Sequence, residues 1–189
     1  MEQKILEAAT HLLETEGPEA LSIRRIAVAA QVAPMGVYNH FGSKQGVVDA
    51  LFRAGFAALG ASMADAETLP DPLAAVVEAG WRYREFALAH RALYAVMFLR
   101  SIPEFRPSAA AIETSLAAFD GIVRVVQRCL ETEQFIEAPV IELAQNLWAL
   151  VHGAVALELL GLTFTDDAEA HYAGLLAMAL DGLRRPTGR

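Results

Sequence analysis

The segment that decides the fold spans residues 32–44 and reads VAPMGVYNHFGSK. Pro34 stands where the first residue of a helix would follow a turn, because proline has no N–H to lose at that position. Gly42 and Ser43 then end this helix after about two turns and cap the next one. Before the turn, Ser22 is a typical N-cap for another short helix. The pattern therefore predicts two short helices separated by a tight turn.

Helical spacing of apolar residues continues on both sides of this segment. A first helix is indicated by apolar residues that share one face, which are Ile5, Leu6, Ala9, Leu12 and Leu13. Further helices are predicted over 44–63, 74–90, 91–99, 109–133, 140–160 and 167–183. No alternating strand pattern occurs, and the prolines fall between these segments or at a helix start. The sequence predicts an all-α protein, with a small three-helix domain over residues 1–45 and a larger helical bundle over residues 46–189.

The distribution of charge separates similar regions. The 189-residue chain carries a net charge of −8 and has a pI near 5.1, an average that speaks against binding a polyanion such as DNA. Residues 22–53, however, contain four basic residues and one acid, a local charge of +3, whereas residues 57–189 sum to −7. The basic segment is suited to contact phosphate, and the acidic body to another task.

Composition limits the class of protein. Hydrophobic residues make up 54% of the chain and charged residues 20%, which excludes a disordered or low-complexity protein. The longest charge-free stretches, 26–43 and 143–157, contain polar residues, so we expect no membrane-spanning helix. The N-terminus lacks the layout of a signal peptide, and we expect a cytoplasmic protein. The single cysteine, Cys129, excludes an intrachain disulfide and a cysteine-based zinc cluster.

Three short helices with a turn before the last one form a helix-turn-helix pattern. The last helix of such a motif can lie in the major groove of DNA. The same pattern also fits an ordinary helical hairpin in the core of a bundle. Periodicity alone does not separate these two interpretations.

The residues themselves carry more information. Residues 32–44, preceded by LSIRRIA over residues 21–27, resemble the DNA-binding signature of the TetR family of bacterial transcriptional regulators. The sequence WALVHG, from Trp148 to Gly153, resembles a Trp-x-x-x-His-Gly motif in the ligand-binding part of one TetR subgroup. The resemblance implies a homodimeric regulator with a helical ligand-binding and dimerisation domain. It further implies a repressor that a small molecule releases from a palindromic DNA operator.

The helix that begins at Pro34 is the expected recognition helix. We expect Val37 and Phe41 to anchor it to the core and its opposite side to face outward. The expected exposed residues are Pro34, Met35, Gly36 and Asn39. Asn39 has the amide geometry for a bidentate contact to adenine, and Met35 can touch a thymine methyl group. These residues are therefore candidates for contacts with base edges.

Further DNA contacts are implied by the resemblance. The positions concerned are Tyr38, His40 and Lys44, which resemble phosphate contacts, Arg24, which resembles a position that reaches the DNA, and its neighbour Arg25. Outside this motif, each side chain would fit an ordinary surface or packing role. The sequence departs from the family where Ala33 replaces the common Ser or Thr cap, and where Met35 replaces a common Gly. These departures bear on which bases are read, and not on the fold.

The acidic body has two candidate features. The candidates for lining a small-molecule pocket are Trp81, Tyr83, Phe86, Met97, Phe98, Phe119, Trp148 and His152. Plain core packing is the alternative for each aromatic residue, and a bond to a backbone carbonyl is the alternative for His152. The last two predicted helices are rich in small residues, which fits either burial within the monomer or a dimer interface.

Two other classes of function were weighed against a regulator. An enzyme is disfavoured because the sequence has no phosphate loop, nucleophile elbow, H-E-x-x-H or G-x-G-x-x-G motif. No two of the five histidines stand at metal-ligand spacing on one helix, so we expect neither a metal nor a cofactor. A helical ligand-binding or interaction protein without DNA-binding activity is the second alternative. A salt-dependent affinity for DNA would separate it from a regulator.

Overall fold

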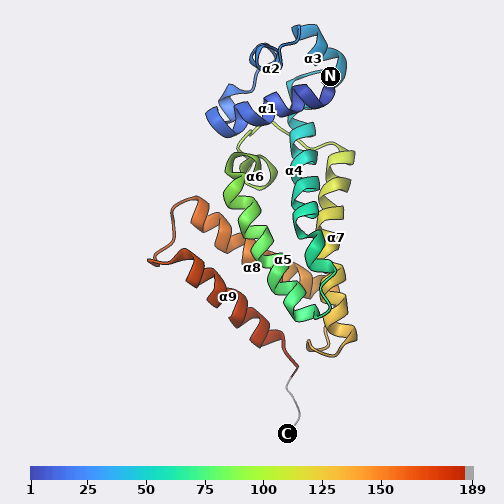
Figure 1. Ribbon diagram of the computed structural model, residues 1–189, viewed down its shortest axis with the longest axis vertical. Helices are drawn as coiled ribbons and strands as arrows, with labels where there is room; N and C mark the ends of the chain where they lie inside the picture. The colour runs from blue at the N-terminus through green and yellow to red at the C-terminus, as the bar shows by residue number, and fades with distance from the viewer. Residues whose placement is uncertain (186–189) are drawn as a thin grey trace. The chain divides into compact units, whose positions relative to one another are not determined.

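The computed structural model describes residues 1–185 and is built from helices (Figure 1). They are α1 (Glu2–Glu16), α2 (Ile23–Ala29), α3 (Pro34–Phe41), α4 (Lys44–Glu67), α5 (Pro72–Ala89), α6 (Arg91–Phe98), α7 (Ala109–Glu131), α8 (Val140–Leu159) and α9 (Ala168–Leu183), with a short 3₁₀ turn at Pro18–Ala20. Within residues 1–185, the only strand-like pairing is an isolated bridge between Phe135 and Arg184. The predicted all-α class is confirmed.

The described chain divides into two compact units. The first unit contains residues 1–58 and 90–117, and the second contains residues 59–89 and 118–185. Helices α4 and α7 each begin in the first unit and end in the second. The first unit therefore holds α1, α2, α3 and α6 complete.

Local signals fix the helices of the first unit. Ser22 accepts a hydrogen bond from the amide of Arg25 and so caps α2, as its position predicts. Gly17 and Gly42 adopt φ angles of 82° and 71°, a left-handed region that favours glycine, and they end α1 and α3. The core of this unit is made of fully buried apolar side chains from α1 to α4, among them Ile5, Leu13, Ile26, Val37 and Leu51.

The second unit has its own apolar core, in which α5, α7, α8 and α9 meet. Its buried residues include Val76, Val125, Val126, Phe135, Leu143, Leu147 and Leu180. Arg128 donates hydrogen bonds to the carbonyl oxygens of Glu67, at the end of α4, and of Leu69 and Pro70, in the connection to α5. Burial raises the pKa of the Cys129 thiol to about 12, so this side chain remains a protonated part of the core.

Two helices have the length and composition of membrane spans, which differs from the expectation of none. They are α4 and α8, whose most apolar 18-residue windows have a mean hydropathy of 1.4. The expectation rested on uninterrupted charge-free stretches, whereas a mean over 18 residues tolerates charges inside the window, such as Asp49 and Arg53 of α4. The core helix of a soluble protein passes the same test. Leu51 of α4 and Leu147 of α8 are indeed buried against neighbouring helices, so length and composition are weak evidence for a span.

Candidate nucleic-acid interface

The turn between α2 and α3 sets the direction of the candidate recognition helix. Gln31 adopts a φ of 54°, and the amide of Val32 donates to the carbonyl oxygen of Ala27, which closes the turn. Ala33 is the N-cap residue of α3 and offers no side-chain cap, but Pro34 at the first helical position has no N–H to satisfy. The departure at Ala33 therefore leaves the start of α3 intact.

One side of α3 is buried and the opposite side is open. Val37 is fully buried, and Phe41, one turn later, is partly buried, as their spacing predicts. Met35 and Tyr38 are 64% and 48% exposed, and Pro34, Asn39 and His40 are exposed as well. At about 100° per residue, Met35 and Asn39 lie opposite Val37, with Tyr38 and His40 on either flank. Gly36 is partly exposed and lies on the same flank as His40.

The junction between α3 and α4 is unusually tight. Ser43 accepts a hydrogen bond from the amide of Gly46 and so caps α4 next to the partly exposed Lys44. A Cβ atom on Gly46 would lie 1.8 Å from the carbonyl oxygen of Phe41, so no larger residue fits there without movement of the backbone. Sequence reasoning missed this requirement, for which the only signal was a glycine within a predicted helix.

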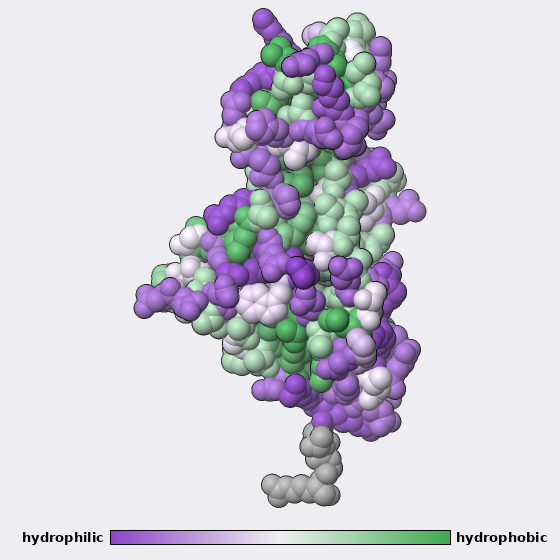
Figure 2. Space-filling view, in the orientation of Figure 1, coloured by the Kyte–Doolittle hydropathy of each residue, from purple (hydrophilic) through white to green (hydrophobic). Residues whose placement is uncertain are grey.

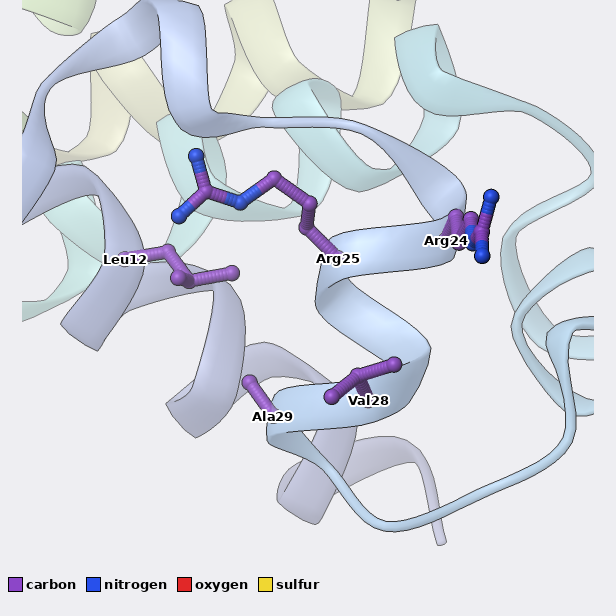
Figure 3. Close-up of a pocket in the computed structure, with 5 residues that line it drawn as sticks. All are labelled: Leu12, Arg24, Arg25, Val28 and Ala29. Carbon is purple, nitrogen blue, oxygen red and sulfur yellow. The ribbon is translucent and has the colours of Figure 1, made fainter.

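The two adjacent arginines of α2 point in different directions (Figure 3). Arg25 turns toward Leu12 of α1 and forms an ion pair with Glu16, whereas Arg24 points away from them. A shallow pocket of about 260 Å³ lies between α1 and α2 and is lined by Leu12, Arg24, Arg25, Val28 and Ala29. Val28, one turn after Arg24, is 73% exposed. Arg24 thus presents its charge to solvent, while Arg25 contributes to the packing of α2 on α1.

The electrostatics of this surface favour an anion. Between Ser22 and Arg53 the only acid is Asp49, whose carboxylate accepts two hydrogen bonds from Ser108. In the view of Figure 2, the N-terminal helices carry mainly hydrophilic side chains, with a few hydrophobic ones among them. The exposed basic and hydrogen-bonding groups can contact phosphate, and the exposed Met35, Val28 and Asn39 can contact base edges.

In the second unit, some of the predicted pocket residues come together. Trp148 and His152 share one face of α8, with ring centroids 5.3 Å apart, and Phe119 lies 6.1 Å from Trp148. The hydroxyl of Tyr83 is 2.9 Å from Nδ1 of His152. Burial lowers the pKa of His152, so its imidazole is neutral at neutral pH. This cluster joins α5, α7 and α8.

The remaining candidates for the pocket have other contacts. Trp81 packs on Tyr172, at 5.2 Å between ring centroids, and Phe86 is buried in α5. Met97 and Phe98 belong to the first unit, where the ring of Phe98 packs edge-on against that of Phe56, with centroids 5.0 Å apart. These four residues make aromatic or core contacts within their own units.

A buried ion pair in the second unit was not predicted from the sequence. Arg84 binds Glu158 through two hydrogen bonds, and its guanidinium lies over the rings of Trp81 and Tyr172. Arg84 and Glu158 are 74 residues apart, so no local pattern links them. Among residues 1–185, no group of three or more His, Cys, Asp or Glu side chains is arranged to hold a metal ion.

Comparisons with known proteins agree with this architecture. Residues 5–51 match the family model described as bacterial regulatory proteins, tetR family, and residues 73–179 match the model of the tetracyclin repressor-like C-terminal domain. No curated protein matched the sequence.

Solved structures of the same fold span nearly the whole chain. A protein of unknown function from Rhodococcus sp. RHA1 is 26% identical, with a TM-score of 0.87 over 97% of this chain and 95% of its own. The TetR family transcriptional regulator PfmR from Thermus thermophilus is 21% identical, with a TM-score of 0.72 over 98% of both chains. The fatty acid degradation regulator FadR from Bacillus halodurans is 18% identical, with a TM-score of 0.78 over 97% of this chain and 100% of its own.

Proposed function

The chain belongs to the TetR family of bacterial transcriptional regulators, and from this premise we propose that it is a homodimeric repressor released from a palindromic operator by a small molecule. Residues 1–45 would form the DNA-binding domain, and residues 46–189 the domain for ligand binding and dimerisation. The observation that carries the proposal is the open face of α3, where Met35 and Asn39 lie opposite the buried Val37.

Each exposed side chain has a role that follows from its chemistry. Asn39 is assigned to an adenine edge and Met35 to a thymine methyl group, with Pro34 and Gly36 allowing close approach of the backbone. Tyr38, His40 and Lys44 are assigned to phosphate oxygens. Such contacts would position the protein on the DNA without reading its sequence. Arg24 has no ion pair among the described contacts and is assigned to the DNA, whereas Arg25 is engaged by Glu16 and would contribute less.

A dimer is supported by exposed surface on α8 and α9. Leu157 and Met178 are 48% and 65% exposed, and a Cβ added at Gly153 or Gly174 would meet nothing within 4 Å. Small residues and exposed apolar side chains allow helices of two protomers to pack closely. A single short helix buries too little surface to specify a DNA site. Two recognition helices about 34 Å apart in a dimer would read the two halves of one palindrome.

The effector is assigned to the second unit, around Phe119, Trp148 and His152. The Tyr83–His152 hydrogen bond places a polar group among aromatic rings, which is the composition of a small-molecule site. Trp81 and Phe86 belong to the same unit and are assigned to the same site, and the assignment of Met97 and Phe98 of the first unit to ligand binding stays a prediction. The resemblance of residues 148–153 to the Trp-x-x-x-His-Gly subgroup supports the same location. The effector would act by binding more tightly to the state with low operator affinity.

The decisive experiment is selection of duplexes from a random pool, followed by fluorescence anisotropy at several salt concentrations. We expect one palindrome to bind saturably, and its affinity to fall steeply with salt because bound phosphates release counterions. Lys44→Glu should lower the affinity at least about tenfold and reduce the salt slope by about 2, since each protomer loses one phosphate contact. The same charge change at Arg185 in the second unit is the matched control. Unchanged affinity for Lys44→Glu would show that the interface lies elsewhere.

A further inference from the structure

Two carboxylates of the N-terminal helices cap helices that lie far away in the sequence. Glu14, near the end of α1, accepts hydrogen bonds from the amides of Ala92 and Leu93 at the start of α6, each at 3.4 Å. Asp49 of α4 accepts from the amide and the hydroxyl of Ser108, at 2.7 and 2.9 Å, directly before α7. Both contacts lie within the first unit.

The start of α6 depends on Glu14 for its capping. The N-cap residue of α6, His90, makes no side-chain cap bond, and the first amides of a helix have no partner within it. The Glu14 carboxylate reaches the second and third amides, which an N-cap side chain normally satisfies, and Nδ1 of His90 lies 4.0 Å from it. A negative charge also interacts favourably with the positive end of the helix dipole. A residue of α1 therefore completes a helix that begins more than 70 positions further along the chain.

The start of α7 is held through a relay. Ser108 caps α7 by accepting from the amide of Ala111, and the Asp49 carboxylate fixes both the backbone and the hydroxyl of that serine. The connection between α6 and α7 is further attached to α4 by Phe105, whose ring lies 5.7 Å from that of Phe52. Both ends of residues 91–108 are thus tied to α1 and α4.

The helices that supply these carboxylates also hold the recognition helix. α1 packs on α2 and α3, and α4 begins three residues after α3 at the tight junction of Gly46 with Phe41. Residues 91–108 are therefore connected to α3 by way of contacts with α1 and α4. We propose that Glu14 and Asp49 are positioning residues that couple the starts of α6 and α7 to the DNA-binding helices, so that occupancy of α3 by operator is felt at both caps. This inference rests on the proposed DNA-binding function.

Hydrogen–deuterium exchange of the full-length protein tests the coupling without an effector. The amides at positions 92, 93, 108 and 111 bond to side-chain oxygens and not to backbone carbonyls of their own helix, so their exchange reports the caps. With the duplex enriched by selection, we expect exchange in peptides covering residues 90–98 and 106–113 to slow about tenfold, because coupling between sites is reciprocal.

The variant Glu14→Gln combined with Asp49→Asn should bind the same duplex but confine the slowing to peptides from residues 20–50. The matched control is Glu7→Gln combined with Asp65→Asn, which makes the same charge change on the exposed sides of the same two helices. Ser108→Ala, which changes no charge, should reduce the slowing at residues 106–113 alone, because the hydroxyl bonds to Asp49 and Ala111 are lost while the amide of residue 108 still donates to Asp49. It tests one arm of the proposal if the double variant is poorly folded by circular dichroism.

The outcomes separate the two proposals. Operator-dependent slowing that persists in the double variant and in Ser108→Ala would overturn the coupling role. A wild-type protein that binds the duplex with no change at residues 90–98 and 106–113 would overturn it as well, and would leave the DNA-binding function standing. Failure to enrich any duplex would overturn the proposed function and this inference together.

Discussion

Arg84 and Glu158 form a bidentate ion pair, with Nε–Oε2 and Nη2–Oε1 distances of 2.9 and 2.8 Å, at a site where Arg84 is only 9% exposed. The hydrogen bonds that Arg84 donates to Glu158 are the main cause that raises the pKa of Arg84, which remains charged. The pair joins α5 to α8, and the rings of Trp81 and Tyr172 cover the guanidinium at 5.8 and 5.6 Å.

Glu158→Gln should destabilise the second unit by about 2 to 3 kcal/mol, because the buried guanidinium loses its nearest counter-charge and one acceptor and keeps only the exposed Glu169 at 3.9 Å. Urea denaturation followed by circular dichroism measures the change. The control is Glu85→Gln, which breaks the exposed pair with Arg82 and should leave the midpoint unchanged. Equal midpoints for both variants would mean that the buried pair adds no stability.

Sequence reasoning succeeded where one residue determines a local conformation. Gly17, Ser22 and Gly42 ended or capped helices as predicted, because capping depends on a few neighbouring residues. The open and buried faces of α3 also followed from spacing alone, since a helix fixes which side chains share a side. The helix-turn-helix segment and its exposed residues could therefore be predicted from the sequence.

Contacts between distant residues could not be predicted in this way. The pairs of Arg84 with Glu158 and of Glu14 with the start of α6 join residues more than 70 positions apart, and nothing in the local pattern selects these partners. Apolar periodicity shows that a residue is buried, and not what it is buried against.

The Gly46 junction predicts a strong effect from a small substitution. Gly46→Ala places a methyl group 1.8 Å from the carbonyl oxygen of Phe41, so α3 or α4 must shift. We expect a loss of more than about 2 kcal/mol in the free energy of unfolding, together with weaker operator binding. Gly36→Ala is the control for the loss of stability alone, because its new Cβ would lie at an ordinary 3.8 Å from Val32, whereas Gly36 itself is assigned to the DNA-contacting surface. A thermal melt of the two variants distinguishes strain from loss of a glycine as such.

His152 gives the second unit a defined dependence on pH. Burial lowers its pKa below the ordinary 6.5, so below that pH the unfolded chain binds a proton that the folded chain does not. The contribution of His152 to the free energy of unfolding is therefore constant above about pH 6.5 and declines as the pH falls below it. Urea midpoints at several pH values should decline less in His152→Gln than in the wild type. His11→Gln, at an exposed position, is the control. An equal decline in the wild type and in His152→Gln would show that the pH dependence does not come from His152.

The proposed dimer interface predicts a change of oligomeric state. Met178→Glu puts a charge on an exposed apolar position of α9, and a charge buried without a partner in an interface is costly. Sedimentation velocity should show a dimer for the wild type and a monomer for Met178→Glu. Ile112→Glu, at an exposed apolar position of α7 in the first unit, should remain dimeric. A dimeric Met178→Glu protein would place the interface elsewhere.

Base reading and phosphate contact predict different consequences for neighbouring residues of α3. Asn39→Ala should cost about 1 to 3 kcal/mol of discrimination at each half-site and relax specificity at one base pair, because the amide is assigned to a base edge. Tyr38→Phe removes a hydroxyl assigned to phosphate, so it should weaken all sequences alike and leave the preferred palindrome unchanged. Repeating the selection from a random pool with each variant measures both effects. If Asn39→Ala enriched the same palindrome with undiminished preference at every position, the Asn39 side chain would not contact a base edge.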